Sequence, residues 1–555
     1  MEYGLLSLLP PLVAIVLAIA TRRAVIPLAI GVFVGAVLLR DPDSAWWSPA
    51  TGFFWAIYDS IFDKSHLQAL CFSLLVGAMV GVLEAGGAME VLIARILKRV
   101  KTRIGAQTLI ATTGLSIFFD DYANTLLVGG TMRSAADRYR ISRSKLAYLV
   151  DSTAAPVAGL AVVSTWAVTE MSYMVDGLTA AGITDPAAGF TLFLQSIPYR
   201  FYPCLAIVMV FLIARSGRDF GPMAKDEVAT LNKDSDQKED EMVDDGSLRY
   251  PWLPTVVPVL VCVAVVIAWL IYSGRVAVGA NTEGIAWWRY FGVLIGNGDS
   301  YVALIYGGLA GWICSLVTHF AVCGSTTKLL AMGSLRGAWH MAPALLILWL
   351  AWALSAMTGD SALDTGGYLK SMLSDTLDPT WLPTIVFLIA GAMAFSTGTS
   401  WGTMAILTSL SVTLSLKMGG GDPNGALCLA TTGSVLAGAI FGDHCSPISD
   451  TTVLSSRASG CDHVDHVRTQ MPYALVVGGV CVVFGCIPAA MGMSPWISLG
   501  IGTATLWGIV RWYGKRPEER ESAASASHSE DASHSEDGNP YRPPSDQASD
   551  DDAPG

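Results

Sequence analysis

The chain has 555 residues, of which 52% are hydrophobic and only 14% are charged. Soluble domains carry about 25% charged residues, so this composition excludes an ordinary soluble protein. Apolar runs of about 20 residues, long enough to cross a hydrocarbon core of about 30 Å, recur from residue 4 to residue 512. The sequence therefore predicts an all-α polytopic membrane protein, with the lipid bilayer as its main surroundings.

The net charge of −12 is confined to two segments. Residues 216–249 contain ten acidic and five basic side chains, and residues 515–555 contain eleven and four, so the rest of the chain is neutral. This distribution does not indicate a nucleic-acid partner. Both segments are poor in large apolar residues. They predict a charged cytoplasmic linker at 216–250 and a disordered acidic cytoplasmic tail at 514–555.

The positions of Lys and Arg predict the membrane spans and the orientation, because basic loops stay in the cytoplasm. Arg22 and Arg23 follow the first apolar run, and Arg511, Lys515 and Arg516 follow the last one. The N-terminus is therefore expected outside and the C-terminus inside. The start MEYG lacks the basic region of a secretory signal, so the first run should remain as a helix. About eleven spans are expected, at residues 4–20, 24–39, 66–84, 146–175, 187–214, 251–272, 301–321, 341–359, 424–455, 471–492 and 494–512.

Two further segments, 104–132 and 382–416, are too long for one span and have similar flanks at both ends. We expect each to be a re-entrant hairpin, although a single span at 104–132 is an alternative. Each hairpin precedes a polar helix that contains a proline, within 146–175 and 424–455.

These patterns predict two membrane halves, 1–215 and 251–513, related as an inverted-topology repeat. In such repeats the substrate site lies near the middle of the membrane, where the halves meet. The sequences of the halves are only weakly similar, and a competing alignment pairs residues 115–121 with 354–360.

Several polar residues lie inside the apolar segments. An ionised carboxylate at the centre of a membrane helix costs about 2.5–3.5 kcal/mol, so retained carboxylates indicate a function. The candidate cation- and proton-binding residues are Asp120, Asp121, Asn124, Asp151, Ser152, Thr153, Asp443, His444, Ser446, Ser449 and Asp450. Further polar contacts are expected from Thr165, Ser396, Thr397, Thr399, Ser400 and Thr403. Within the first set, we place a Na⁺ site at Asp121, Asp151 and Asp443.

Two prolines are expected to interrupt these helices. Proline lacks an N–H group, so Pro156 would free the carbonyl of Ser152, and Pro447 would free that of Asp443. Free carbonyls and carboxylates are ligands for Na⁺ in transporters. Because burial favours the neutral form of a carboxyl group, such a site can take up either H⁺ or a metal cation. This behaviour is that of an exchanger, with Na⁺ and H⁺ as transported ions and no cofactor.

Structural alternatives apply to some of these residues. Asp120 and Asp450 could cap helices, since Asp is favoured at that position, and His444 could be a hydrogen-bonded core residue. The ten cysteines form no CxxC pair and lie mostly in apolar runs, which indicates packing rather than a metal site.

Three stretches resemble a known family: SIFFDDYANTLLVGGTMR (116–133), AYLVDSTAAPVAGLAVVSTW (147–166) and FGDHCSPISDTTVLSS (441–456). They are similar to the signatures of the NhaC-type sodium/proton antiporters. The resemblance implies Na⁺/H⁺ exchange, with Li⁺ able to replace Na⁺, in the cell membrane by alternating access. It also implies that the polar candidates within these motifs bind the ions.

Other functions stay open at this stage. One alternative is a Na⁺- or H⁺-coupled exchanger or symporter of a small organic acid or amino acid, although we identified no Lys or Arg at membrane depth to hold the anion. Another is an intramembrane hydrolase using His444, Ser446 and Asp450, which lacks the GxSxG motif of hydrolases; we expect a transporter and not an enzyme. The sequence also leaves open whether the chain forms a homodimer.

Overall fold

The computed structural model describes residues 3–21, 23, 25–41, 43–185, 188–232, 248–278, 294, 298–359, 361–373 and 378–517. The centre of the expected linker, 233–247, and the expected tail from residue 518 lie outside the described residues, as does Asp360 of the competing alignment. In the described part, the chain is helical, and its isolated strand-like pairing is a bridge between Asp219 and Lys515.

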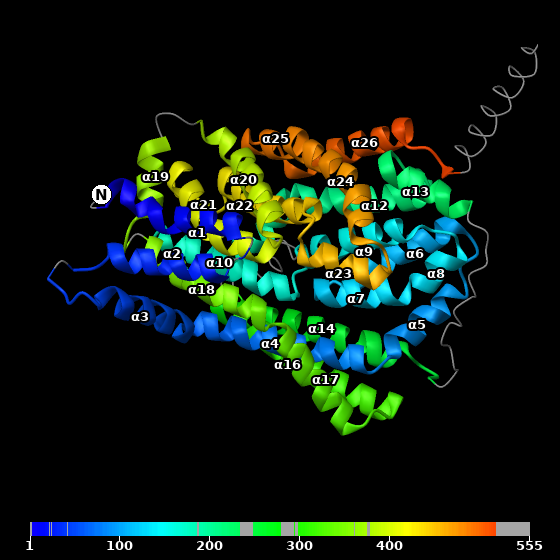
Figure 1. Cartoon of the computed structure of the whole chain (residues 1–555). Coiled ribbons are helices and arrows are strands. Elements are labelled where there is room, and N and C mark those ends of the chain that lie inside the picture. The colour runs from blue at the N-terminus through cyan, green and yellow to red at the C-terminus, as the bar shows by residue number, and fades with distance from the viewer. Residues whose placement is uncertain are drawn as a thin grey trace, which may run out of the picture.

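The helices of the first half are α1 (Leu9–Thr21), α2 (Val25–Leu38), α3 (Ser48–Phe62), α4 (Lys64–Ala85), α5 (Ala88–Leu97), α6 (Arg103–Ser116), α7 (Asp121–Thr131), α8 (Arg133–Arg138), α9 (Arg143–Ala158), α10 (Thr165–Ala180), α11 (Ala188–Ser196), α12 (Phe201–Ser216) and α13 (Gly221–Leu231). Those of the second half are α14 (Trp252–Val278), α16 (Ser300–Cys323), α17 (Thr327–His340), α18 (Ala342–Thr358), α19 (Thr365–Leu373), α20 (Leu382–Thr397), α21 (Ser400–Met418), α22 (Ala426–Cys445), α23 (Asp450–Ser459), α24 (His463–Val480), α25 (Ile487–Ala490) and α26 (Pro495–Tyr513). Most of them run along one common direction (Figure 1).

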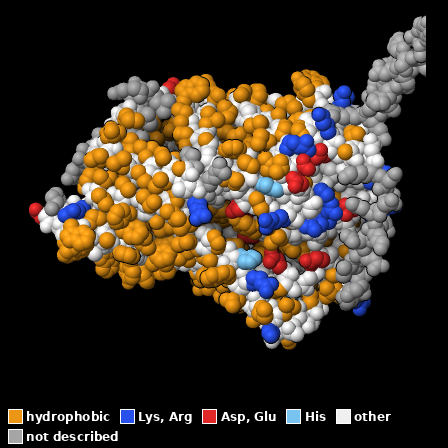
Figure 2. Space-filling model, viewed as in Figure 1, with side chains coloured by type: hydrophobic (Ala, Val, Ile, Leu, Met, Phe, Trp, Pro, Cys, Tyr) orange, Lys and Arg blue, Asp and Glu red, His pale blue; other side chains and the backbone are white. Residues whose placement is uncertain are grey.

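The surface of this bundle is that of a multi-pass membrane protein. On the face in Figure 2, apolar side chains cover one end and the flanks, whereas Lys, Arg, Asp and Glu gather at the other end, where α5, α8 and α13 lie in Figure 1. Among the described residues, seven helices are long and apolar enough to cross a membrane, and the bent pair Ala188–Tyr199 and Phe201–Ser216 would make an eighth. The sequence predicts more spans, about eleven, because it counts the shorter apolar helices Gly4–Ala18 and Val25–Leu38 and the segment 146–175, which consists of the two short helices α9 and α10.

Four breaks interrupt the helices of the central region, each inside a segment for which the sequence predicts a hairpin or an interrupted helix. They separate α6 from α7, α9 from α10, α20 from α21, and α22 from α23. One detail differs from expectation. Helix α9 continues through Pro156 to Ala158, because a proline removes one hydrogen bond without always ending a helix. Pro447, in contrast, lies within the break between α22 and α23.

Six of the described helices lie outside the expected spans and hairpins, namely α3, α5, α8, α13, α17 and α19. Helices α3 and α17 occupy segments expected as an outer and an inner loop, and α13 lies in the expected linker. The segment before α13 is held in place by residues of other helices. Its Asp219 accepts hydrogen bonds from Lys145 (2.6 Å) and Tyr473 (2.9 Å). Composition alone could not reveal this order, because the stabilising partners are distant in the sequence.

Candidate functional site

The four helix breaks contact one another in pairs. The backbone N–H of Thr165, at the start of α10, donates to the carbonyl of Phe119 in the break between α6 and α7 (3.0 Å). The N–H of Asp450, at the start of α23, donates to the carbonyl of Gly398 in the break between α20 and α21 (3.2 Å). The rings of Trp166 and Trp401 lie 5.2 Å apart between their centroids and join α10 to α21. The four breaks thus meet, and the last of them reaches the surface, where Pro447, Ile448 and Asp450 are exposed.

Three consecutive residues at the start of α23 connect the acidic segments. Asp450 accepts a hydrogen bond from the hydroxyl of Tyr122 on α7 (2.5 Å). The hydroxyl of Thr451 donates to Asp443 on α22 (2.8 Å), and the hydroxyl of Thr452 donates to Asp151 on α9 (3.3 Å). We call the group Asp121, Asp151, Asp443 and Asp450 the carboxylate cluster. It brings together residues more than 300 positions apart in the sequence.

Several oxygens in and beside this cluster are buried without a hydrogen-bond partner among the described residues. They are both carboxylate oxygens of Asp121, Oδ1 of Asp151, Oδ1 of Asp443, Oδ1 of Asn124 and Oγ1 of Thr125. The side chains of Asp121 and Asp443 are fully buried. A buried carboxylate without a partner carries a large free-energy cost, which either a proton or a cation removes. The cluster therefore has the chemistry of a site where H⁺ and a cation compete.

Asp151 is more fully bonded than Asp121 and Asp443. Its Oδ2 atom accepts from Gln470 Nε2 at 2.6 Å and lies 3.4 Å from Nε2 of His466, both on α24. The sequence analysis missed these two partners. A signal was present, because His466 and Gln470 are four residues apart and share a helix face in a polar stretch before an apolar run.

Two residues near Asp121 hold the first break in place. Asp120 caps α7 by accepting from the N–H of Ala123 (2.8 Å), and it also accepts from the hydroxyl of Thr165 (3.0 Å). The alternative that Asp120 is a helix cap is therefore confirmed. The side-chain nitrogen of Asn124, which carries two N–H donors, lies within hydrogen-bond distance of the carbonyl oxygens of Gly114 (2.6 Å), Ile117 (3.0 Å) and Thr153 (3.0 Å).

The second break is held by residues around Pro447. Ser449, and not Asp450, caps α23 by accepting from the N–H of Thr452. Ser446 donates to the carbonyl of Phe395 on α20 (2.7 Å). His444 Nδ1 lies 3.0 Å from the hydroxyl of Tyr202. His444, Ser446 and Asp450 thus have separate partners and do not form the hydrogen-bonded triad of a hydrolase.

The remaining predicted residues are less directly connected to the carboxylates. Ser152 and Thr153 are buried on α9, and Thr153 donates to the carbonyl of Leu149 within its own helix (2.7 Å). Around the second hairpin break, Ser396, Thr397 and Thr403 bond to nearby backbone, Thr399 occupies the cap position of α21 without a capping bond, and Ser400 donates to the carbonyl of Ala439. In the described part of the chain, none of these hydroxyls forms a hydrogen bond with a carboxylate of the cluster.

The expected Na⁺ site at Asp121, Asp151 and Asp443 stays a prediction. No group of three His, Cys, Asp or Glu side chains that could hold a metal ion occurs in the described part of the chain, but Na⁺ also takes carbonyl oxygens as ligands. Asp443 has hydroxyl oxygens beside it, since Thr451 bonds to it and Ser449 lies 3.0 Å from Thr451.

A buried arginine corrects another expectation. We identified no Lys or Arg at membrane depth, yet Arg200, at the bend between α11 and α12, is fully buried. Its guanidinium donates to Glu170 on α10 (2.6 Å) and to the carbonyl of Gly159, at the end of α9. It also lies 4.7 Å from the ring centroid of Phe193. In the sequence, Arg200 lies near the middle of the expected span 187–214.

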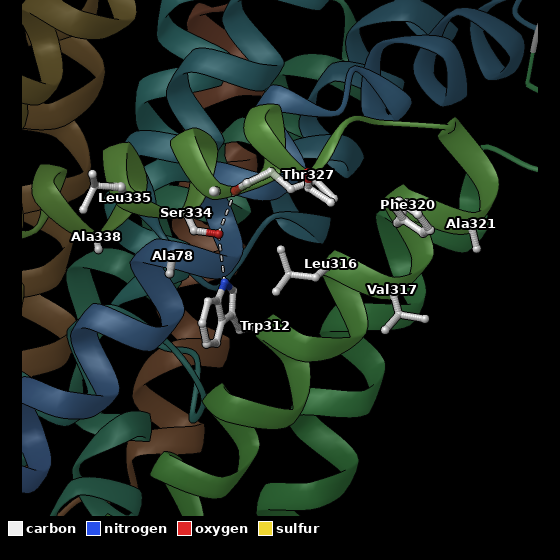
Figure 3. Close-up of a pocket in the computed structure, with 12 residues that line it drawn as sticks. Ala78, Trp312, Leu316, Val317, Phe320, Ala321, Thr327, Ser334, Leu335 and Ala338 are labelled. Atoms are coloured by element: carbon white, nitrogen blue, oxygen red, sulfur yellow. Dashed lines mark hydrogen bonds between the residues drawn. The ribbon is translucent and has the colours of Figure 1, made fainter.

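A large cavity lies elsewhere, between α4, α16 and α17 (Figure 3). Its volume is about 810 Å³, and its lining is almost entirely apolar. The polar contacts drawn inside it are the hydrogen bonds from the indole of Trp312 to Ser334 (3.0 Å) and from the hydroxyl of Ser334 to the carbonyl of Leu330 (2.9 Å). Because no carboxylate lines it, this cavity does not suit a small cation.

The sequence matches the model of a known protein family. The family model described as the Na⁺/H⁺ antiporter family matches residues 157–487, more than half of the chain. A protein of Haemophilus influenzae described as uncharacterized is 33% identical over 481 residues, which cover 85% of this chain and 88% of the relative. The malate-2H⁺/Na⁺-lactate antiporter of Bacillus subtilis is 37% identical over a shorter stretch of 84 residues, which covers 15% of this chain and 17% of the relative.

Solved structures of transporters resemble the whole bundle, and one of them illustrates the likeness. The crystal structure of the YdaH transporter of Alcanivorax borkumensis superimposes with a TM-score of 0.53, covering 90% of this chain and 99% of that one. The sequences are only 13% identical, so the likeness concerns the fold alone.

Proposed function

This chain belongs to the Na⁺/H⁺ antiporter family and is a secondary antiporter, and we propose that it exchanges Na⁺, with Li⁺ as a substitute, for H⁺. The observation that carries the proposal is the set of carboxylate oxygens on Asp121 and Asp443 that have no hydrogen-bond partner among the described residues. Each of these side chains is buried next to a helix break, where carbonyl and hydroxyl oxygens are close by.

Exchange follows from competition for these oxygens. A proton or a Na⁺ ion each neutralises a buried carboxylate, and binding of one reduces the affinity for the other. Alternating access to the two sides of the membrane then converts the competition into antiport. The paired breaks supply segments that can move against each other, as in transporters built from repeats. We further propose the cell membrane as the location, with the N-terminus outside and the C-terminus in the cytoplasm.

The residues have different roles in this proposal. Asp121 and Asp443 bind the ions, and Thr451 and Ser449 supply hydroxyl ligands next to Asp443. Asp151, bonded through Oδ2 to Gln470 and close to His466, positions the start of α23 through Thr452. Because these carboxylates interact, their protons titrate as a set rather than one by one.

The test uses acid-loaded vesicles that contain the purified protein and a pH-sensitive dye. Addition of external Na⁺ should raise the internal pH with wild-type protein, and Asp443→Asn and Asp121→Asn should each lower the rate by at least about tenfold, because the neutral amide cannot exchange a proton. Asp422→Asn, in an exposed loop, is the matched control and should keep the wild-type rate. An absent wild-type response, or an unchanged response in Asp443→Asn, would falsify the proposal.

The second candidate is an exchanger of a small organic acid or amino acid, and the buried Arg200 favours it. A guanidinium is well suited to bind a carboxylate, but here Glu170 already occupies it. An organic anion would have to displace Glu170 or bind beside it. Counterflow of radiolabelled malate or lactate, inhibited in Arg200→Lys, would support this candidate, and its absence alongside Na⁺-driven proton movement would exclude it.

A further inference from the structure

A second acid–base pair lies outside the carboxylate cluster. His66, near the start of α4, places Nε2 at 3.4 Å from Oδ1 of Asp176 on α10. Its Nδ1 atom lies 2.5 Å from the carbonyl oxygen of Ser60. The two side chains are 14% and 13% exposed, so the protein does not fully enclose the pair.

The surroundings of His66 suit a doubly protonated ring. The Ser60 carbonyl and the Asp176 carboxylate both accept hydrogen bonds, and a neutral imidazole has only one N–H to donate whereas the imidazolium has two. The ring also stacks on Trp352 at 3.8 Å, with 4° between the planes, and an indole face attracts a cation. The carboxylate of Asp63 adds to the negative field at His66. A proton on His66 is therefore stabilised from several sides.

Asp176 offers a second place for a proton. Its Oδ2 atom is buried and has no hydrogen-bond partner among the described residues. The ionisable groups near it, apart from His66 and Asp63, are Tyr173 and Tyr301. The hydroxyls of both tyrosines are likewise without a partner in the described part of the chain. Asp176 therefore has an acceptor oxygen, Oδ2, that is still available, and the hydroxyls of Tyr173 and Tyr301 near it are available as donors.

A line of buried polar side chains leads from this pair to the first helix break. Thr165, Thr169, Ser172 and Asp176 follow one another at intervals of four, three and four residues, which places them on one face of α10. At 1.5 Å per residue they span about 16 Å. At one end, Thr165 donates to Asp120, the neighbour of Asp121 (3.0 Å). Side chains at this spacing are about 5–6 Å apart at their Cβ atoms, a gap that one bridging water can close.

The position of His66 along α4 indicates on which side of the protein the pair lies. Helix α4 ends at Ala85 and is followed by α5, which carries the basic residue Arg95. His66 lies at the opposite end of α4, about 30 Å away along a 22-residue helix. The pair is therefore on the side away from the basic segments.

From this arrangement we propose that His66 and Asp176 form an outer proton-binding site, through which the carboxylate cluster exchanges protons with the solvent on the side opposite the basic loops. The inference deepens the proposed Na⁺/H⁺ exchange and rests on it for its role in transport. Protons would pass between the pair and Asp120–Asp121 along the polar face of α10.

Two measurements test the inference. In nanodiscs, ¹⁵N-histidine spectra of the eight histidines, with the His66 signal assigned by its loss in His66→Gln, should show this ring changing its protonation state as the pH is varied, and Asp176→Asn should shift that titration. In vesicles of known orientation, the exchange rate is measured against outer pH at fixed inner pH. His66→Gln and Asp176→Asn should flatten the outer-pH profile from about tenfold to about twofold across the histidine range.

Asp59→Asn removes an exposed carboxylate from the neighbouring helix α3 and should keep the wild-type profile. Only variants with the wild-type unfolding temperature are compared. If His66→Gln does not fold, Asp176→Asn alone tests the outer-pH profile. A His66 ring that does not titrate, or variants with the wild-type outer-pH profile, would overturn the inference. If the ring titrates but wild-type vesicles show no Na⁺-driven proton movement, the proposed exchange fails while the proton site stands.

Discussion

Asn124 illustrates how a single side chain organises the site. Its amide nitrogen lies within hydrogen-bond distance of three carbonyls, two at the end of α6 and one on α9. These carbonyls surround the break that carries Asp121. An asparagine is well suited to this place because its amide supplies two N–H donors without charge.

We predict that Asn124→Ala destabilises the protein by about 2–3 kcal/mol, because buried carbonyls lose their donor, and that Na⁺-driven exchange falls with it. The thermal unfolding midpoint of the purified protein measures the first effect, and the vesicle assay measures the second. Asn424→Ala, in an exposed loop, is the control. An Asn124→Ala protein with the wild-type midpoint and rate would show that the amide does not hold the break.

At the scale of the elements, the contact between two breaks depends on Gly398. This residue has φ of +69°, and a Cβ atom there would collide with the carbonyl oxygen of Ile448, in the break before α23. The backbone of the second hairpin can therefore approach the start of α23 closely only with glycine. That approach is what brings the N–H of Asp450 to the carbonyl of Gly398.

We predict that Gly398→Ala reduces exchange strongly, whereas Gly420→Ala does not. Gly420 has a similar φ of +79°, but a Cβ atom there would meet no other atom within 4 Å. Both substitutions incur about 1–2 kcal/mol of backbone strain, so a difference between their rates in the vesicle assay isolates the steric contact. Equal rates in the two variants would contradict the role of this contact.

The sequence predicted the breaks better than it predicted their partners. The breaks at Asp120–Asp121 and around Pro447 can be recognised from the sequence alone, because charged residues and proline are costly in an apolar helix. The link from Thr452 to Asp151 could not be predicted, since it joins residues 301 positions apart through the packing of α23 on α9. The buried Arg200 was missed for the same reason: its partner Glu170 lies on another helix.

At the scale of the whole molecule, a buried ionic network joins the membrane bundle to the charged end. Lys145 on α9 is fully buried and lies 2.6 Å from Asp219 and 3.7 Å from Glu227. Glu227, on α13, also pairs with Arg103 at the start of α6. The network ties α13 to both helices that carry the first-half breaks.

We predict that Lys145→Met destabilises the protein by about 3–5 kcal/mol, because it leaves the buried carboxylate of Asp219 without its cationic partner. The double variant Lys145→Met/Asp219→Leu should recover much of this loss, since an apolar pair can replace a buried ion pair. Thermal unfolding measures both, with Lys328→Met, at an exposed position on α17, as the control. A double variant less stable than the single one would contradict this account.

The central claim is that the unpartnered oxygens beside the helix breaks bind the transported cation. The most direct measurement is a pair of high-resolution structures of the wild-type protein, one in Na⁺ and one in a bulky organic cation. We predict density in the Na⁺ structure alone, coordinated by a carboxylate oxygen of Asp443 or Asp121 and by nearby carbonyl and hydroxyl oxygens. Identical density in both structures, or a Na⁺ site away from both carboxylates, would contradict the claim.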